Sequence, residues 1–447
     1  MLVDTISKQI FDVTTQRFVQ SLQHRTPAGS FRDFQLWGIS DKNPQRDIWV
    51  QILGIPQLTA LTRKLLDGIL TDDEWGQMSE YIATMNAYLL HETVSDNIAI
   101  GMYYHNAHGD TADLRMQVIA SFNDATISLL ESANSEQGEQ LLMSVQPHAE
   151  RISRFQHSLT ETEMRHFATL YRKMSATSHV AKDLEFNPLP SLWTNMYTCH
   201  DVAVSSTELA CADLVKRGLV WRYASVNRQL RDLSNLTVAD LVETGAHSIL
   251  VMPVLAYYIG VIAEIIKPND AFADVLADNS LETALYDAAL LVRLLNDLGT
   301  GLLTQQTERA LLHQQLLKQV SKPRTRTFIQ ALEAVAKQNV ALTRLNKDIQ
   351  HGEFNVVLAK MIDVTASKAA VEEFMQLLDQ FATIYDTHYN RMLSLSAGLS
   401  ERLGTDFASQ LIIRFVKFHE KIYSQRFDTQ DGDYATKPKQ SLAATGD

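Results

Sequence analysis

The chain has 447 residues, of which 45% are hydrophobic and 21% are charged, and its formal net charge is −12. This composition is ordinary for a soluble globular protein and excludes a fibrous or wholly disordered chain. The negative charge, together with the lack of a basic stripe carrying interleaved aromatic residues, argues against a nucleic-acid binder, which would have to neutralise phosphates.

The cysteine content and the apolar runs favour a cytoplasmic protein without a membrane span. Cys199 and Cys211 are too few for a disulfide framework, and we expect both to stay reduced. No run approaches the roughly 20 uninterrupted apolar residues that a span requires. The most apolar stretch, 248–266, is broken by Pro253 and contains Glu264, which favours a buried helix.

Helical periodicity dominates the chain, with only 10 prolines and 18 glycines to interrupt it. Alternating patterns of strand length are nearly absent, so we predict an all-α fold. The expected helices lie at about 2–23, 56–68, 72–107, 110–132, 136–157, 160–177, 189–231, 236–266, 281–318, 324–350, 354–361, 367–397 and 401–424.

The composition along the chain predicts three parts. Residues 1–45 are expected to form an N-terminal helix and a linker, because 30–44 is rich in Gly, Asp, Asn and Pro. Residues 46–425 form one large helical domain, in which the prolines at 187–190 separate two halves. The polar segment 426–447 is predicted to be a disordered tail.

The most informative segment is the apolar run 288–300, which includes Arg293, Asn296 and Thr300. At about 100° per residue, these side chains and Thr304 fall on one side of a helix. The amide, carboxylate and hydroxyl oxygens of this segment are the hard ligands that Mg²⁺ takes beside water and substrate phosphates. A guanidinium one turn earlier can clamp the same phosphate. The alternative interpretation is a helix end, since Asn-Asp-Leu-Gly is common at helix C-termini.

Four segments in chain order point to one family. They are Leu-Pro-Ser-Leu-Trp at 189–193, Asp-Leu-Val-Glu-Thr-Gly at 240–245, Asn-Asp-Leu-Gly-Thr at 296–300 and Gly-Glu-Phe-Asn-Val-Val at 352–357. Together they resemble the class I terpene synthases. The resemblance implies a single large terpenoid-synthase-like helical bundle with a central active-site cavity, in which Gly245 lies where a helix breaks beneath the substrate. It also implies that the third segment begins the family's second Mg²⁺ motif.

This chain departs from the family's second metal motif in its acidic ligand. In the family that ligand follows two helical turns after the Asn, but the position here is Thr304. Counting back from 352–357 places Asp348 there instead, which predicts that 305–346 is an insertion broken by a proline; Glu308 is the competing donor. The metal ligands implied by the resemblance are Asn296, Thr300, Thr304 and Asp348.

The family's aspartate-rich first metal motif has no recognisable counterpart upstream. Three segments are candidates for its place: Glu92 and Asp96 one turn apart, the pair at 123–124, and a segment with Arg154 and His157 but no carboxylate. The simpler interpretations are a solvated face for the first pair and a surface pair for the last.

The resemblance implies that Mg²⁺ and arginines ionise an allylic isoprenyl diphosphate, because the leaving group needs its negative charge neutralised. The favoured outcome is transfer to the amino nitrogen of an amino acid, as in the family's kainoid-pathway branch, which uses L-glutamate. Aromatic residues make up only 8% of the chain and the upstream helices are polar, which favours a polar second substrate over a cyclase pocket. A terpene cyclase is the alternative.

The resemblance assigns two sets of site residues. The predicted catalytic residues are Arg293, Asn296 and Thr300. The predicted substrate-binding residues are Arg154, His157, Gly245, Tyr389 and Arg391. Arg154 and His157 are assigned to the acceptor, whereas Tyr389 and Arg391 are expected to cap the pocket as the family's late Arg-Tyr pair does, in a different order.

Two other classes of protein remain open. Glu163 and His166 have the Glu-x-x-His spacing of a helical metal oxidase, although a second copy is missing. A non-catalytic helical interaction protein would have exposed apolar stripes and no polar-tipped cavity. Neither a nucleophile elbow nor a phosphate-binding glycine loop is present. The sequence specifies no oligomeric state.

Overall fold

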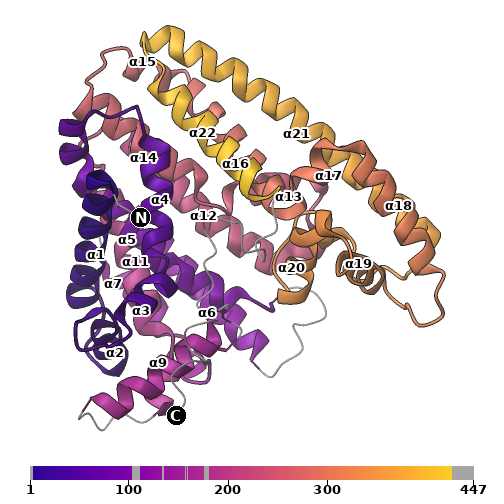
Figure 1. The fold of residues 1–447 in the computed structure, drawn as a ribbon, viewed down its shortest axis with the longest axis horizontal. Helices are drawn as coiled ribbons and strands as arrows, with labels where there is room; N and C mark the ends of the chain where they lie inside the picture. Colours follow the sequence, from indigo (N-terminus) through magenta and orange to yellow (C-terminus); the bar gives the residue numbers. More distant parts are fainter. Residues whose placement is uncertain are drawn as a thin grey trace.

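The computed structural model describes residues 4–102, 111–132, 135–156, 158, 160–175 and 181–424. These residues form helices joined by turns and short loops (Figure 1), which confirms the all-α prediction. Within the same ranges, extended pairing is limited to two isolated bridges, Ser153 with Phe186 and Thr327 with Thr365. The predicted tail at 426–447 and His157 lie outside the described residues.

The first half of the chain is arranged around the long helix α5. Helix α1 packs along one side of it and α11 along another. The start of α5 is fixed by a capping box between Thr71 and Glu74, because each side chain accepts a hydrogen bond from the other residue's backbone. The helices are α1 (Thr5–His24), α2 (Ser30–Ile39), α3 (Arg46–Leu53), α4 (Ile55–Leu66), α5 (Asp72–Ala99), α6 (Ala112–Glu131), α7 (Ser135–Met143), α8 (Gln146–Ala149), α9 (Glu161–Met174) and α10 (Ala181–Glu185).

The predicted linker at 30–44 is wrong over most of its length, because helix α2 occupies Ser30–Ile39. Phe34 and Trp37 are buried in a small apolar cluster that is separate from the main core. In this cluster the Phe34 ring lies 5.1 Å from that of Trp49. Burial of these aromatic side chains outweighs the turn-forming residues around them.

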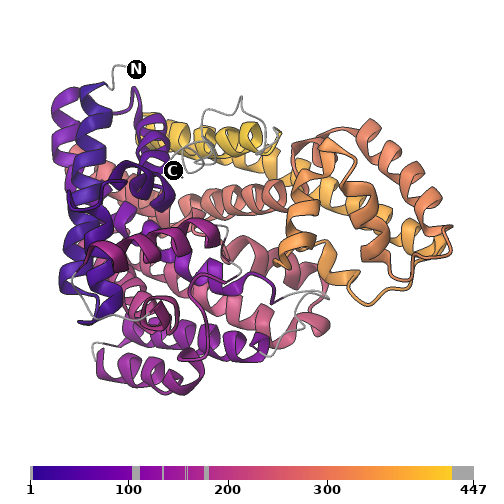
Figure 2. The same ribbon diagram turned by 60° about the horizontal axis from the view of Figure 1, so that its bottom comes forward.

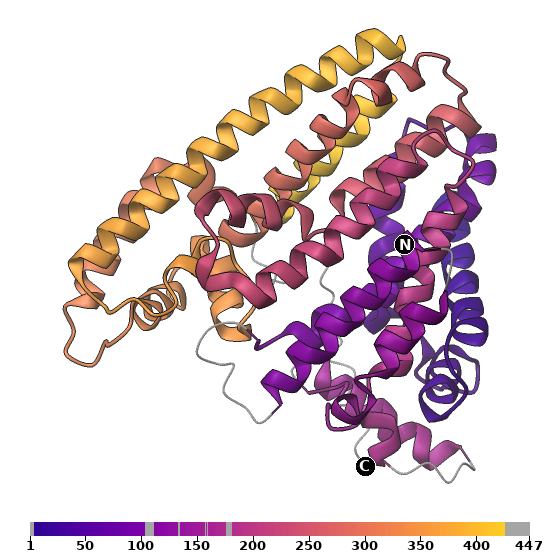
Figure 3. The same ribbon diagram turned by 180° about the vertical axis from the view of Figure 1, so that it is seen from behind.

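The second half is arranged around helix α16, which contacts α13, α14, α21 and α22. Figure 2 shows α16 and α22 side by side, with the segment α17–α20 projecting at the end opposite α1. Seen from behind, α6 and α12 run alongside each other (Figure 3). The helices are α11 (Leu189–Ser205), α12 (Ala212–Asp232), α13 (Val238–His247), α14 (Val251–Val261) with a π-helical turn (Ile262–Ile266), α15 (Phe272–Ala277), α16 (Ser280–Leu298), α17 (Thr300–Thr304), α18 (Gln306–Val320), α19 (Phe328–Ala336), α20 (Thr343–His351), α21 (Lys368–Leu403) and α22 (Phe407–Ile422). Short 3₁₀ turns occupy Leu233–Asn235, Val340–Leu342 and Leu358–Lys360.

Several long predicted helices are divided in the structure. The helix expected at 281–318 ends at Leu298, because Gly299 has φ 79° and ψ 157°, and it resumes as α17 and α18. The helix expected at 189–231 is broken between α11 and α12, and the helix expected at 324–350 is divided into α19 and α20. The segment 354–361 contains only a 3₁₀ turn.

Helix α13 and helix α14 with its π-helical turn bend by 43° at residues 248–250. The pair is apolar enough to pass together as a bent membrane span by length and composition, whereas no single helix within the described ranges does so. Every residue of α14 is buried inside the protein.

A close helix contact provides a test of this packing. A Cβ at Gly260 of α14 would lie 2.0 Å from Cys211 Sγ, so a side chain there forces Cys211 or the buried helix to move. We expect Gly260→Ala to lower the free energy of unfolding by about 1–3 kcal/mol. In Gly398→Ala on α21, the matched control, the new Cβ meets no atom within 4 Å, and stability should rise by about 0.5–1 kcal/mol. Urea denaturation of both variants decides; equal stabilities would contradict the packing.

Candidate functional site

A pocket of about 620 Å³ lies among helices α4, α5, α6, α12, α14, α16 and α22 and the loop after α20. Its volume falls within the range of small-molecule sites, about 300–1,000 Å³. One part of its wall is apolar and includes Leu58, Leu65, Leu89, Val226, Val254 and Phe415. The other part carries charged and amide side chains on two facing walls. One wall is formed by α5 and α12, and the other by α16, α20 and the loop after α20.

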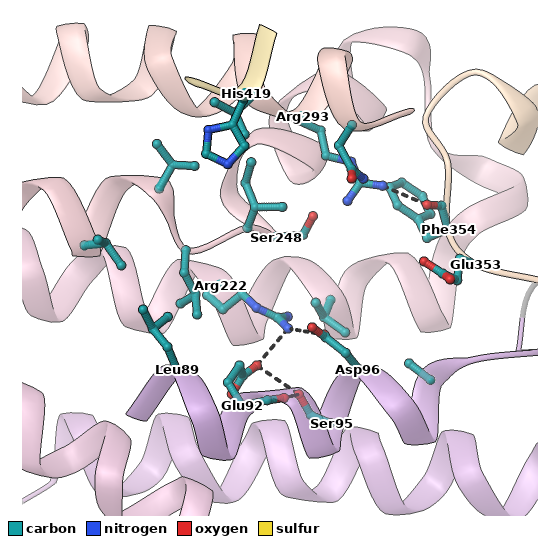
Figure 4. A pocket seen from close by; sticks show the side chains of 18 of the residues that line it. Leu89, Glu92, Ser95, Asp96, Arg222, Ser248, Arg293, Glu353, Phe354 and His419 are labelled. Atoms are coloured by element: carbon teal, nitrogen blue, oxygen red, sulfur yellow. Dashed lines mark hydrogen bonds and ion pairs between the residues drawn. The ribbon is translucent and has the colours of Figure 1, made fainter. Parts of the chain in front are cut away.

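The first charged wall joins α5 to α12. Glu92 and Asp96 are four residues apart, so they project from the same face of α5. Arg222 of α12 reaches both carboxylates, with Nη2 2.8 Å from Glu92 Oε1 and 3.3 Å from Asp96 Oδ1. Figure 4 shows this guanidinium between the two acids at the edge of the pocket.

Glu92 is buried, with 4% of its side-chain surface exposed, so the interpretation of a solvated face is wrong for this residue. Its Oε2 accepts hydrogen bonds from the Tyr223 hydroxyl at 2.9 Å and from Asn195 Nδ2 at 2.7 Å. Its Oε1 accepts from Ser95 and Arg222. Both oxygens are therefore committed to the protein, and the role that this geometry gives Glu92 is to orient Arg222.

Asp96 differs from Glu92 because its side chain is open, with 70% of its surface accessible. Its carboxyl lines the pocket, so protein surrounds it although it is open to the cavity. Burial, opposed by Arg222 and reinforced by Glu92 and Glu353, raises the pKa of Asp96 to about 6. Asp96 is thus the accessible acid of this wall.

The second charged wall is formed by α16 and the loop after α20. Arg293 pairs with Asp297 one turn along α16, with Nη2 2.9 Å from Oδ1. The same guanidinium donates to the Phe354 carbonyl oxygen at 2.7 Å and lies 4.9 Å from the centre of the Phe354 ring. Arg293 therefore has a fixed orientation at the pocket (Figure 4).

Lys347 and Glu353 add a further ion pair to this wall, with Nζ 2.6 Å from Oε2. Burial would raise the pKa of Glu353, but the hydrogen bond from His351 and the charge and hydrogen bond of Lys347 outweigh it and lower the pKa to about 2. The pocket thus carries an ionised carboxylate at Glu353 facing the wall that bears Asp96.

Of the four predicted metal ligands, the structure places only Asn296 on the pocket. Because Gly299 ends α16, the continuous helix that would align these residues is absent. The Thr300 hydroxyl donates to the Glu420 carbonyl oxygen at 2.7 Å, and the exposed Thr304 donates to the Thr300 carbonyl oxygen at 2.8 Å. The prediction of one common ligand face is therefore corrected.

Asp348 and Asn296 are both engaged by other protein groups. Asp348 is buried and accepts a hydrogen bond from Asn355 Nδ2 at 2.7 Å. The side-chain amide oxygen of Asn296 accepts a hydrogen bond from Arg344 Nη2. The backbone carbonyl oxygen of Asn296 accepts a second one from Arg344 Nε at 2.7 Å. Asn296 reaches the pocket, and a metal bound by its amide oxygen would have to share that oxygen with Arg344 or displace it.

Arg154 lies on the other face of α5, at a second cavity of about 90 Å³ that His91 also lines. Its Nη2 donates to the Asp183 carbonyl oxygen at 2.8 Å, and its guanidinium lies 4.5 Å from the centre of the Phe31 ring. These contacts connect it to the backbone before α11 and to α2. The structure therefore does not bring Arg154 together with Arg293 and Asn296.

The three remaining predicted substrate-binding residues also lie off the pocket lining. Gly245 lets α13 approach α16 closely, since a Cβ there would lie 2.8 Å from Val356 Cγ1 and 3.3 Å from Arg293 Cγ. Tyr389 stacks on Tyr385 at 5.9 Å. Arg391 forms a two-pronged ion pair with the buried Asp287, with Nε 2.7 Å from Oδ2.

Sequence reasoning did not single out Lys347 or His419, which both line the pocket. Lys347 directly precedes Asp348, which was identified by counting back from the segment 352–357. Lys347 could therefore have been predicted only through its neighbour Asp348. His419 lies on α22, more than 120 residues after Arg293, and no local pattern marks it. Arg222 lies within the helix expected at 189–231, and sequence reasoning gave it no role in the site.

Hard oxygen donors that suit Mg²⁺ are present on both walls, at Asp96, Asn296 and Glu353. In the described ranges, no group of three or more His, Cys, Asp or Glu side chains is placed to hold a metal ion. The Glu-x-x-His pair of α9 does not provide one, since His166 Nε2 lies 2.8 Å from Gln45 Oε1. These three side chains line one pocket, and a metal held there would take the rest of its shell from a ligand and water.

No family model matches this chain, and no curated protein or solved structure gives a significant match.

Asp348 gives a pH test of this arrangement. Burial, opposed by Lys347 and reinforced by Asp297, raises its pKa to about 6. An acid whose pKa is raised by folding contributes stability that is full below about pH 4 and is lost as the pH rises through the folded pKa. The free energy of unfolding of the wild type relative to Asp348→Asn should therefore fall between pH 4 and pH 7 in urea denaturation.

Asp278→Asn is the control, because hydrogen bonds from Ser280 lower the pKa of Asp278. Because folding lowers the pKa of Asp278, its contribution to the free energy of unfolding depends on pH in the opposite way. That contribution is lost as the pH falls through the folded pKa. The two variants should show opposite slopes against pH. A rising slope for Asp348 would mean that its carboxyl is stabilised as the anion.

Proposed function

We propose that this pocket binds an allylic isoprenyl diphosphate, ionises it with the help of Mg²⁺, and transfers the resulting cation to the amino nitrogen of an amino acid such as L-glutamate. The observation that carries the proposal is the division of one pocket into an apolar wall and two charged walls. An isoprenyl diphosphate is divided in the same way, because its hydrocarbon chain suits the apolar wall and its charged diphosphate suits the charged walls.

Arg222, Arg293 and Lys347 supply the positive charge that a diphosphate needs. Arg293 and Arg222 are each held by a carboxylate of their own wall, Asp297 and Glu92. Charges that are oriented before the ligand arrives stabilise a leaving anion without reorganisation during the reaction. Lys347 is a compact cation on the same wall as Arg293 and suits a phosphate oxygen as a point charge.

Asp96, Asn296 and Glu353 are the residues that would hold Mg²⁺ together with the diphosphate. When bound, the metal would neutralise the charge that develops on the leaving group. Release of the Asn296 amide oxygen by Arg344 is part of this proposal, since the two are hydrogen-bonded. The carboxyl of Asp96 is the accessible acid that approaches from the facing wall.

An amino acid acceptor is supported by the mixed charge of the pocket. Both signs of charge line the pocket, so charged groups are available for the acceptor's amino group and for its carboxylates. These groups replace Arg154 in the acceptor's part of the proposal, because Arg154 lies at the other cavity. The apolar wall keeps water away from the cation until the nitrogen attacks.

The apolar wall also favours a second candidate function, in which the cation reacts with a double bond of the same substrate. Tyr258 and Phe415 line the pocket and offer aromatic faces, which attract positive charge. A non-catalytic interaction protein is disfavoured, because a pocket with an apolar wall and opposed charged walls is not expected of a simple docking surface.

The Asn296→Ala variant tests the proposal. We expect Mg²⁺-dependent release of diphosphate to fall by about 100-fold, because the variant loses an oriented group beside the leaving group. Asn390→Ala is the matched control, since Asn390 is exposed on α21 and its Nδ2 donates to the Asp386 carbonyl oxygen of its own helix. Released diphosphate is measured enzymatically, and circular dichroism checks that both variants stay helical. Equal rates for Asn296→Ala and the wild type would contradict the proposal.

A substrate panel distinguishes transfer from cyclisation. The wild type is incubated with dimethylallyl, geranyl or farnesyl diphosphate and Mg²⁺, with and without L-glutamate, and the products are identified by mass spectrometry. We expect an N-prenyl amino acid whose formation requires both substrates. A cyclic hydrocarbon formed at the same rate with and without the amino acid would select the cyclase, and no diphosphate release from any substrate would rule out both.

A further inference from the structure

His419 of α22 is a basic side chain of the pocket that the proposed transfer does not use. Its ring packs within an aromatic group on the same helix end, 4.6 Å from the ring of Phe415 and 5.7 Å from that of Tyr423. Figure 4 shows the imidazole directed into the pocket, on the side away from Asp96 and Glu92. It is thus a base beside the apolar part of the wall.

The hydrogen bonding of His419 fixes which ring nitrogen is free to accept a proton. Its Nδ1 lies 2.7 Å from the Phe415 carbonyl oxygen. A carbonyl oxygen only accepts, so Nδ1 carries the hydrogen and Nε2 carries the lone pair. Among the residues that the structure describes, none donates a hydrogen bond to Nε2.

His419 is also neutral at physiological pH. Burial lowers the pKa of its imidazole to about 4, although the hydrogen bond to the Phe415 carbonyl opposes the shift. Such a weak base leaves an ammonium group protonated, since the pKa of an amine is several units higher. A carbocation is a far stronger acid than an ammonium, so a neutral imidazole is basic enough to take its proton.

We propose that His419 is the proton acceptor for a second activity of this pocket, the release of an acyclic isoprenoid hydrocarbon when no amino acid is bound. This inference rests on the proposed ionisation of an allylic diphosphate. The bond between carbon and the diphosphate oxygen breaks, and its electron pair leaves with the diphosphate. A C–H bond next to the cation then breaks, its electron pair forms the new double bond, and the proton goes to His419 Nε2.

The other bases at the pocket are less suited to this step. Asp96 lies beside Arg222, and Glu353 is paired with Lys347, so both belong to the charged walls where the leaving group and the metal are proposed to lie. His419 lies against Phe415 and next to the apolar wall that would hold the hydrocarbon chain. His419 is therefore the base that would lie next to the hydrocarbon part of the substrate.

The test uses geranyl diphosphate and Mg²⁺ without an amino acid, and it measures diphosphate, hydrocarbon and alcohol separately. His419→Phe keeps an aromatic ring in the stack and removes the lone pair, and His419→Gln keeps a polar side chain. In both variants we expect the hydrocarbon formed per diphosphate to fall by about 100-fold, the contribution of a positioned base. Diphosphate release should stay within about threefold of wild type, with an alcohol from water capture replacing the hydrocarbon.

His313→Gln on α18 is the control, because His313 pairs with Glu372 away from the pocket, and its product ratio should equal that of the wild type. A purely structural role of His419 would lower diphosphate release and hydrocarbon together and leave their ratio unchanged, which overturns the inference. The inference is also overturned if the wild type releases diphosphate but forms only alcohol. In that case the proposed ionisation still holds. Absence of diphosphate release from the wild type overturns both.

A second measurement does not depend on turnover. In the wild type labelled with ¹⁵N-histidine, one imidazole should show a protonated Nδ1 and an unprotonated Nε2 at pH 7, and these signals should be missing from His419→Phe. A protonated Nε2 at His419 would overturn the inference.

Discussion

The buried carboxylate of Asp297 is the constraint on which the pocket depends. It is fully buried, and burial raises its pKa although Arg293 opposes the shift. A carboxylate in such a position is stable only when donors surround it. One donor, Arg293, comes from its own helix, and another, the backbone amide of Val356 at 2.8 Å, comes from a loop 59 residues further along the chain. Asn355 Nδ2 also donates to the Asp297 carbonyl oxygen at 2.9 Å. These bonds bring Glu353 to the pocket.

The facing wall follows the same physical rule at Glu92. This carboxylate receives its donors from Asn195 of α11 and from Arg222 and Tyr223 of α12, so it joins three helices. Removal of either partner of such a buried pair leaves a charge without compensation, which is costly in a medium of low polarity. The two walls therefore present their arginines in fixed orientations. A ligand with a dense negative charge would meet cations that need little rearrangement.

The sequence predicted the helical class and several helix ends, because both are local properties. The period of apolar residues gives the helices, and the capping box at Thr71 gives the start of α5. The insertion expected at 305–346 contains two helices on either side of Pro323, as the break there predicted. The helix expected at 236–266 is bent between α13 and α14, near the place where the resemblance implies a break. Whether the bundle has the terpene-synthase arrangement stays a prediction.

The candidate site was predictable only in part. Arg293 and Asn296 were identified because polar groups within an apolar helix are uncommon, and both line the pocket. Glu92 and Asp96 were identified by their spacing, but nothing in their own helix distinguishes a buried acid from a solvated one. His419 gave no signal, since a single histidine next to a phenylalanine is typical of many helices.

The amino-acid sequence by itself determined the helical class, most of the helical segments, which faces are apolar and which segments are rich in oxygen ligands. The tertiary structure decided which partner each polar group received. Thr300 was expected beside Asn296, but its hydroxyl bonds to α22 through the Glu420 carbonyl oxygen. Asp348 was expected at the metal, but it bonds to Asn355. The reason is physical: helix periodicity depends on neighbouring residues, whereas a buried polar group takes the donor or acceptor that packing brings to it from a distant part of the chain.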